Sequence, residues 1–155
     1  MAGLINELIE VLGEECENFE NLLGLSYEKN QVIVKNDIES LQKITKLENI
    51  LVGNNQKLER RRERIIKDMA TVLGKKDGEL TITMLWEMLK GQKEHQALVE
   101  VSKKLLDIVE QLKITNETNK TLVEMSLNHV EFNMNLLRNT SRDDNQNTSM
   151  FQAQQ

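Results

Sequence analysis

No proline occurs anywhere in the 155 residues of this chain. Proline is the strongest breaker of helices, because it lacks a backbone N–H and its ring clashes with the preceding turn. Only 3% of the residues are aromatic, whereas leucine, glutamate and lysine, which favour helices, are abundant. The composition therefore predicts an all-α fold of long helices, and the length suits one domain.

Apolar residues recur at intervals of three and four over three long segments, which is the spacing that places them on one face of a helix. In the second segment this stripe includes Leu58, Ile65 and Val72. We expect long helices and one short helix, "TMLWEML", over residues 4–34, 38–73, 83–89 and 92–138.

Turn-forming residues separate these segments. Asn36 tolerates the left-handed conformation of a helix C-cap, and Asp37 can cap the helix that follows. The glycine-rich stretch "GKKDG" at residues 74–78 ends the second helix, and Thr81 or Thr83 can cap the short one. The short connections predict that the first two long helices are antiparallel.

The expected architecture is an antiparallel bundle of three long helices plus one short connecting helix. At about 1.5 Å per residue, the long helices measure roughly 45, 55 and 70 Å, so the last one overhangs the bundle by roughly 15 Å. We expect a helical domain over residues 1–138 and a disordered polar tail over residues 139–155. Met150 and Phe151 are the only large apolar residues of this tail.

Two apolar series run along the C-terminal part of the last predicted helix. The first continues the stripe that we expect to face the bundle and consists of Val123, Leu127, Val130, Met134 and Leu137. The second points roughly 150° away from it, at about 100° per residue. Its members are Leu122, Met125, His129, Phe132 and Leu136.

A helix that is apolar on two sides is either central in a bundle or available to a partner. Because a bundle of three helices has no central helix, the second series favours a binding surface for a partner helix. Burial by the short helix, by the tail folding back or by self-association remains open. The last case would make the chain a self-associating coiled-coil scaffold protein and a homodimer.

The residues offer little evidence for a nucleic-acid, metal or catalytic site. The basic stretch "KLERRRERIIK" contains Glu59 and Glu63, which indicates a salt-bridged helix face, and a net charge of −5 argues against nucleic-acid binding. His95 and His129 lack the Glu-x-x-His spacing of a di-iron bundle, and Cys16 suits the core. We therefore expect no metal, no cofactor, no small-molecule substrate and no catalytic residue, and thus not an enzyme.

The sequence also favours the cytoplasm. Its first residues, "MAGLINELIEVLGEE", lack the positive region of a signal peptide. No apolar run approaches the roughly 18 residues that a membrane span needs. The single cysteine, Cys16, cannot form an internal disulfide.

Four stretches resemble the FlgN family of flagellar type III export chaperones, in the same order along the chain. They are "LINELIEVLGEE", "VIVKNDIESLQKITKLENILV", "RRERIIKDMATVLGKKDGELTITML" and "ETNKTLVEMSLNHVEFNMNLL". The turn in "VIVKNDIESL" and the cap in "GELTIT" carry most of the likeness, which covers the chain up to about residue 137.

The resemblance implies a bacterial cytoplasmic chaperone that binds the C-terminal helices of hook–filament junction (hook-associated) proteins, prevents their premature assembly and assists delivery to the export gate. It implies that the client-binding region is the C-terminal helical part. In this chain that region carries the second series, with Leu122, Met125, Phe132 and Leu136 as contacts and His129 at the rim. An export-gate component is a further implied partner. The tail departs from the family in having no tyrosine, so a docking aromatic there is limited to Phe151, next to Met150.

Overall fold

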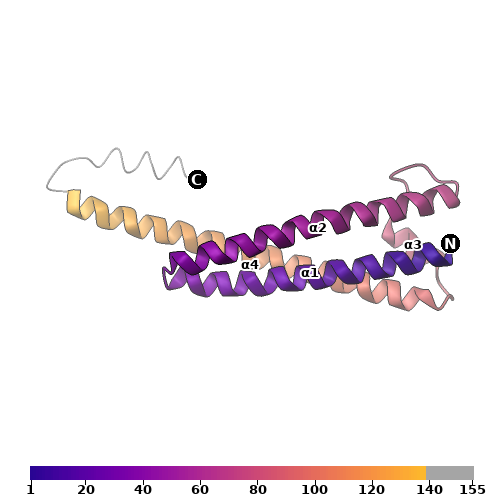
Figure 1. The fold of residues 1–155 in the computed structure, drawn as a ribbon, viewed down its shortest axis with the longest axis horizontal. Coiled ribbons are helices and arrows are strands. Elements are labelled where there is room, and N and C mark those ends of the chain that lie inside the picture. The colour runs from indigo at the N-terminus through magenta and orange to yellow at the C-terminus, as the bar shows by residue number, and fades with distance from the viewer. Residues whose placement is uncertain (139–155) are drawn as a thin grey trace.

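The computed structural model describes the backbone of residues 1–138 and the side chains of residues 1–121. Its elements are all helices (Figure 1), namely α1 (Ala2–Val34), α2 (Ile38–Val72), α3 (Ile82–Met88) and α4 (Glu94–Arg138). No strand occurs in this part of the chain, so the all-α prediction is confirmed. The predicted disorder of residues 139–155 concerns residues outside the described part.

The helix ends follow the predicted turn chemistry. Asn36 has a φ of 55°, in the left-handed region, and the Asp37 carboxylate accepts a hydrogen bond of 3.1 Å from the Ser40 amide. Thr81, and not Thr83, caps α3, because its hydroxyl oxygen accepts a hydrogen bond of 3.2 Å from the Met84 amide. Each cap satisfies a backbone N–H that has no partner inside its helix.

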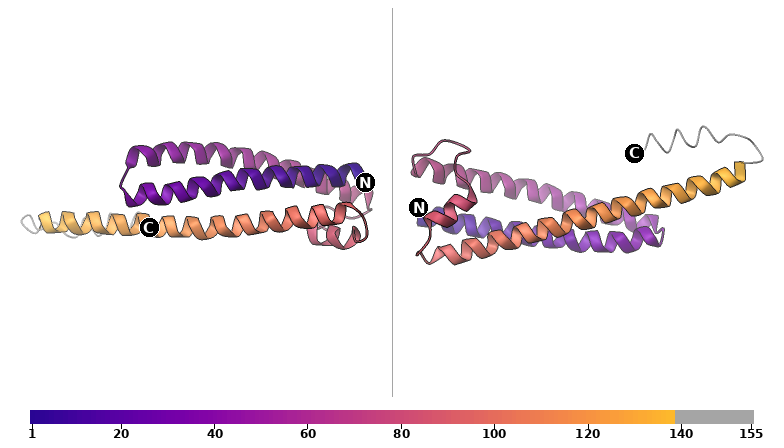
Figure 2. Two further views of the ribbon diagram at one scale, coloured as in Figure 1. Left: turned by 90° about the horizontal axis from the view of Figure 1, so that it is seen from below. Right: turned by 180° about the vertical axis from the view of Figure 1, so that it is seen from behind.

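α1 lies between the two other long helices. It runs antiparallel to α2 and parallel to α4 (Figure 1), and it packs along both of them. In the described residues no Cα atom of α2 comes within 8 Å of one of α4, and Figure 2 shows α1 between them. α1 packs against both other long helices through one broad face, which carries its buried residues, whereas residues such as Glu7, Glu10 and Glu17 on its other side are exposed.

The apolar core is concentrated at the end of the molecule that holds the N-terminus and α3. The largest fully buried apolar side chains there come from all four helices: Leu8, Leu12, Met69, Leu85 and Leu98. Three of the four buried residues of α2 belong to this end, and only Ile44 is buried in the half of α2 near the α1–α2 turn. Away from α3, the core is therefore thinner.

Val72 was expected in the core stripe, but it is 60% exposed. Leu58, Ile65 and Val72 are spaced by seven residues, and such a row drifts by about 20° per heptad around a straight helix. Ile65 is buried at 5% exposure, whereas Val72 is the last residue of α2, so the end of the helix adds to this small drift. Met69, which belongs to the same predicted stripe, is fully buried, and its neighbour Ala70 is 1% exposed.

α4 continues without a break through Asn116 and Asn119 and extends past the α1–α2 turn (Figure 1). A hydrogen bond of 2.9 Å joins Asn119 to Ser26 of the parallel helix α1. Because α1 ends at Val34, eight residues after Ser26, its end is level with about residue 127 of α4. The remaining part of α4 overhangs by about 16 Å, close to the length expected from the sequence.

Candidate partner-binding face of the last helix

One face of α4 is buried against α1 and the α3 end. Its apolar part consists of Leu98, Leu105 and Ile108, which are at most 7% exposed. Further along, Thr115 and Asn119 are 8% and 4% exposed. These positions are three, four or seven residues apart, so they mark a single inward face of the helix.

Polar contacts fix the rotation of α4 about its own axis. The Asn119 side-chain amide donates to the Ser26 carbonyl at 2.9 Å and to the Ser26 hydroxyl at 3.2 Å. That hydroxyl in turn donates to Asn116 Oδ1 at 3.1 Å. A buried asparagine in a helical seam typically fixes register, since a slip would leave its amide without partners. Rotating α4 would therefore break this network.

An ion pair supports the same register closer to α3. Lys104 Nζ lies 2.9 Å from Glu20 Oε1 on α1, and this hydrogen bond raises the pKa of the lysine. The Cys16 thiol donates to the Val101 carbonyl at 3.6 Å. Burial raises the pKa of the Cys16 thiol, and its burial at 3% exposure agrees with the expected core position.

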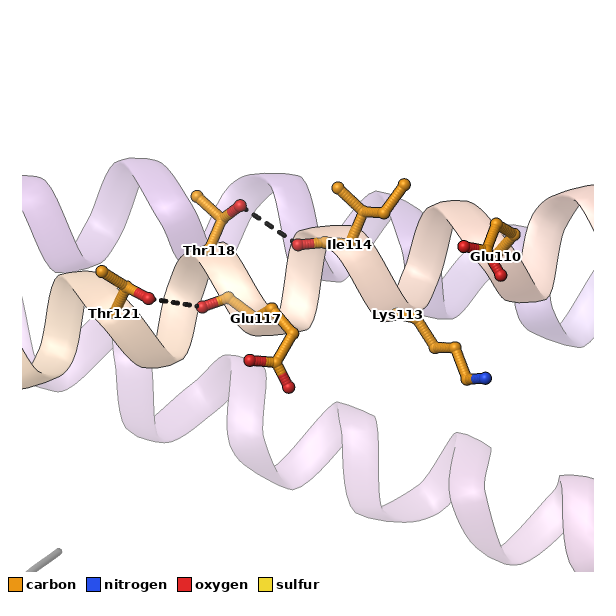
Figure 3. Close-up of a pocket in the computed structure, with 6 residues that line it drawn as sticks. All are labelled: Glu110, Lys113, Ile114, Glu117, Thr118 and Thr121. Atoms are coloured by element: carbon orange, nitrogen blue, oxygen red, sulfur yellow. Dashed lines mark hydrogen bonds between the residues drawn. The ribbon is translucent and has the colours of Figure 1, made fainter.

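The opposite side of α4 is open. It carries a hollow of about 560 Å³ (Figure 3), lined by Glu110, Lys113, Ile114, Glu117, Thr118 and Thr121. Ile114 is 60% exposed although it is a large, branched apolar side chain. The hollow is thus an uncovered helix face with an apolar residue inside it.

Both threonines of the hollow bond back to their own helix (Figure 3). The Thr118 hydroxyl donates to the Ile114 carbonyl at 3.1 Å, and the Thr121 hydroxyl donates to the Glu117 carbonyl at 3.0 Å. Such bonds satisfy the hydroxyl hydrogen within the helix. The threonine methyl groups then add apolar surface beside Ile114.

This open face leads into the predicted binding segment. Positions four residues apart share a face of a helix, so Ile114, Thr118 and position 122 form one row. The helical backbone of α4 contains all five predicted client-binding positions: Leu122, Met125, His129, Phe132 and Leu136. Their side chains lie outside the described residues, as do Met150 and Phe151 of the tail.

The N-terminal continuation of this face is not among the positions predicted from the sequence. Ile114 and Thr118 stand eight and four residues before Leu122. This spacing places them on the same helix face as Leu122, so the sequence alone could have indicated the continuation. Threonine was overlooked because it counts as polar in a hydrophobicity pattern. Its apolar presentation depends on the back-bonded hydroxyl that only the structure shows.

The basic stretch forms ion pairs, and those with α1 lie across the α1–α2 interface. Arg61 Nη1 lies 2.6 Å from Glu14 Oε2, and Arg62 Nη1 lies 3.0 Å from Glu15 Oε2. The sequence pointed to Glu59 and Glu63 of the same helix as partners, and of these only Glu59 pairs in the described residues, at 3.9 Å from Arg62 Nη2. Within the described residues, no group of three or more histidine, cysteine, aspartate or glutamate residues could hold a metal ion.

A comparison with protein-family models matches residues 1–148 to the FlgN protein family. The chain belongs to the FlgN family. The match spans all four helices. No curated protein and no solved structure matches the chain.

FlgN is a chaperone family. Membership implies a general role as a flagellar export chaperone and, in general, binding of flagellar hook-associated proteins. Over the residues that the structure describes, no helix is both long and apolar enough to cross a membrane.

Proposed function

We propose that this FlgN-family protein is a cytoplasmic export chaperone that binds the C-terminal helices of hook–filament junction proteins. The outer face of α4 would hold them, through Leu122, Met125, Phe132 and Leu136, with His129 at the rim. The observation that carries the proposal is the position of α4. Its inner face is committed to α1 by the Ser26–Asn119 contact, its outer face is open at residues 110–121, and its backbone extends past the α1–α2 turn.

The mechanism is physical and involves no chemical step. Helices that assemble with neighbours in a filament expose apolar faces before assembly, and an amphipathic helix can instead cover such a face. Methionine suits this role because its unbranched thioether adapts to different partner shapes. The client must be released at the export gate, so very tight binding would be a disadvantage. We expect a micromolar or submicromolar dissociation constant; about 1 µM corresponds to a binding free energy of about −8 kcal/mol.

The first prediction concerns Phe132. Phe132→Asp should abolish binding of a peptide that contains the C-terminal helices of a hook–filament junction protein, because a carboxylate would be buried without a partner. Titration calorimetry should show saturable binding near 1:1 for the wild type. The matched control is Ile50→Asp, which changes an apolar residue that is 61% exposed on α2.

Two results would count against this proposal. One is an absence of binding heat for the wild type at several temperatures. The other is unfolding of the free Phe132→Asp protein, which would make Phe132 a core residue. If instead the same face closes a homodimer, sedimentation would show a dimer that Phe132→Asp dissociates, as expected for a coiled-coil scaffold protein.

We also propose that the tail, through Met150 and Phe151, contacts a component of the export gate. Both residues are large and apolar in an otherwise polar segment.

A further inference from the structure

The exposed face of α4 does not begin at Leu122. It extends back along the helix through Thr118 to Ile114, in the part of α4 that packs beside α1. We propose that the client helix continues along this face and that Ile114 is an anchor for it. The proposal rests on the proposed function and sets how far the binding surface extends.

The shape of this surface fits a helix. The lining residues of the hollow stand at positions 110, 113, 114, 117, 118 and 121, which is one face of α4 over about three turns. Figure 3 shows Ile114 between the two acidic residues along the helix. A second helix laid beside this row would bury Ile114 and the threonine methyl groups together, as in ridge-and-groove packing.

Because the hydroxyls of the two threonines already donate hydrogen bonds, covering them with a partner costs little free energy. An unsatisfied hydroxyl costs free energy when it is buried. Here the Thr118 and Thr121 hydroxyls already donate to carbonyls of α4 at 3.1 and 3.0 Å. A partner can therefore cover them without supplying an acceptor.

The charges beside the hollow indicate the chemistry of the occupant. Glu110 and Glu117 stand seven residues apart, with Lys113 between them, and none of the three forms an ion pair within the described residues. The fitting partner is an amphipathic helix with basic residues about seven positions apart beside its apolar stripe. A client's terminal helix of this pattern is the occupant to which we commit.

The test uses Ile114→Asp in the full chain, titrated with a client peptide that contains the C-terminal helices. We expect the affinity to fall by about tenfold or more, because burial of a large apolar side chain is lost. The control is Val72→Asp, since Val72 is also β-branched and is likewise 60% exposed, but lies on α2. The affinity of the Val72→Asp variant for the client peptide should equal that of the wild type.

A second variant tests the charges. In Glu110→Gln/Glu117→Gln, affinity should become less sensitive to salt than in the wild type, because two screened attractions are removed. This variant keeps the size and polarity of both side chains, so folding should be unaffected.

The outcomes distinguish a failure of this proposal from a failure of the proposed function. If Phe132→Asp abolishes binding while Ile114→Asp and the double variant leave it unchanged, the client does not extend beyond Leu122 and this proposal fails alone. If Phe132→Asp has no effect either, the proposed function fails too. If Ile114→Asp dissociates a dimer of the free chain, the occupant is a second copy, and the proposal is overturned.

Discussion

Glu15 is the least expected residue of the bundle. It is 1% exposed, its Oε2 lies 3.0 Å from Arg62 Nη1, and its Oε1 has no hydrogen-bond partner within the described structure. Burial raises its pKa above the ordinary value of 4.5 and outweighs the opposing effect of Arg62. A buried ion pair of this kind is weak evidence for stability, because desolvation opposes the attraction.

The raised pKa gives a signed prediction for stability. Above pH 4.5, the folded state holds the Glu15 proton more strongly than the unfolded state does, so stability falls as pH rises towards the folded pKa. Lowering the pH from about 7 to about 5 should therefore stabilise the wild type relative to Glu15→Gln, which cannot titrate there. Urea unfolding of both proteins at the two pH values measures this difference. If the difference in free energy of unfolding between the two proteins is the same at both pH values, or changes in the opposite direction, Glu15 is not the titrating group.

At the scale of the helices, the glycines fall into two classes. Gly13, Gly24 and Gly53 lie inside helices, where a Cβ atom would meet no other atom within 4 Å. Gly74 and Gly78 lie in the loop after α2 with φ values of 69° and 79°. In the loop, glycine is needed for the backbone conformation, whereas in the helices it only increases the flexibility of the unfolded chain.

These classes predict opposite effects of the same substitution. Gly24→Ala should raise the free energy of unfolding by roughly 0.5–1 kcal/mol, because alanine has the higher helix propensity. Gly74→Ala should lower it by roughly 1 kcal/mol or more, because a left-handed conformation strains an alanine. Thermal or urea unfolding of both variants provides the comparison. If both substitutions changed the free energy of unfolding in the same direction, the helix around Gly24 or the loop at Gly74 would differ from the structure.

At the scale of the whole molecule, stability is distributed unevenly. α2 has three buried residues near α3, namely Ile65, Met69 and Ala70, but only Ile44 near the α1–α2 turn. On the turn half, Leu47 and Ile50 are 50% and 61% exposed. Segments with few buried contacts open locally at lower free energy than the core does.

Hydrogen exchange should detect this gradient. Amides of residues 40–55 should exchange at least about tenfold faster than those of residues 62–70 after correction for intrinsic rates, which corresponds to about 1.4 kcal/mol in opening free energy. Both segments lie in the same helix, so helix formation alone cannot cause the difference. Uniform protection along α2 would mean that the thin half of the core is as stable as the α3 end.

The sequence alone determined the helices and their ends, because these depend on local chemistry. The absence of proline, the three- and four-residue periodicity, the cap at Asp37 and the cap at Thr81 or Thr83 act within a few residues of chain, and the structure chose Thr81. The likeness to the FlgN family was also readable from the sequence, and the family match over residues 1–148 confirms it. The client-binding positions from Leu122 to Leu136 stay a prediction.

Only the tertiary structure decided which helix contacts both of the others, where the core lies and which part of the α4 face is open. Periodicity gives the direction of a helix's apolar face, but it does not give the distance to a neighbour. Val72 therefore looked buried and is exposed, and Ile114 and Thr118 were not recognised as part of one open face. Arg62 could be assigned to a charged face, but its pairing with buried Glu15 depends on how α1 and α2 pack across 47 residues of sequence.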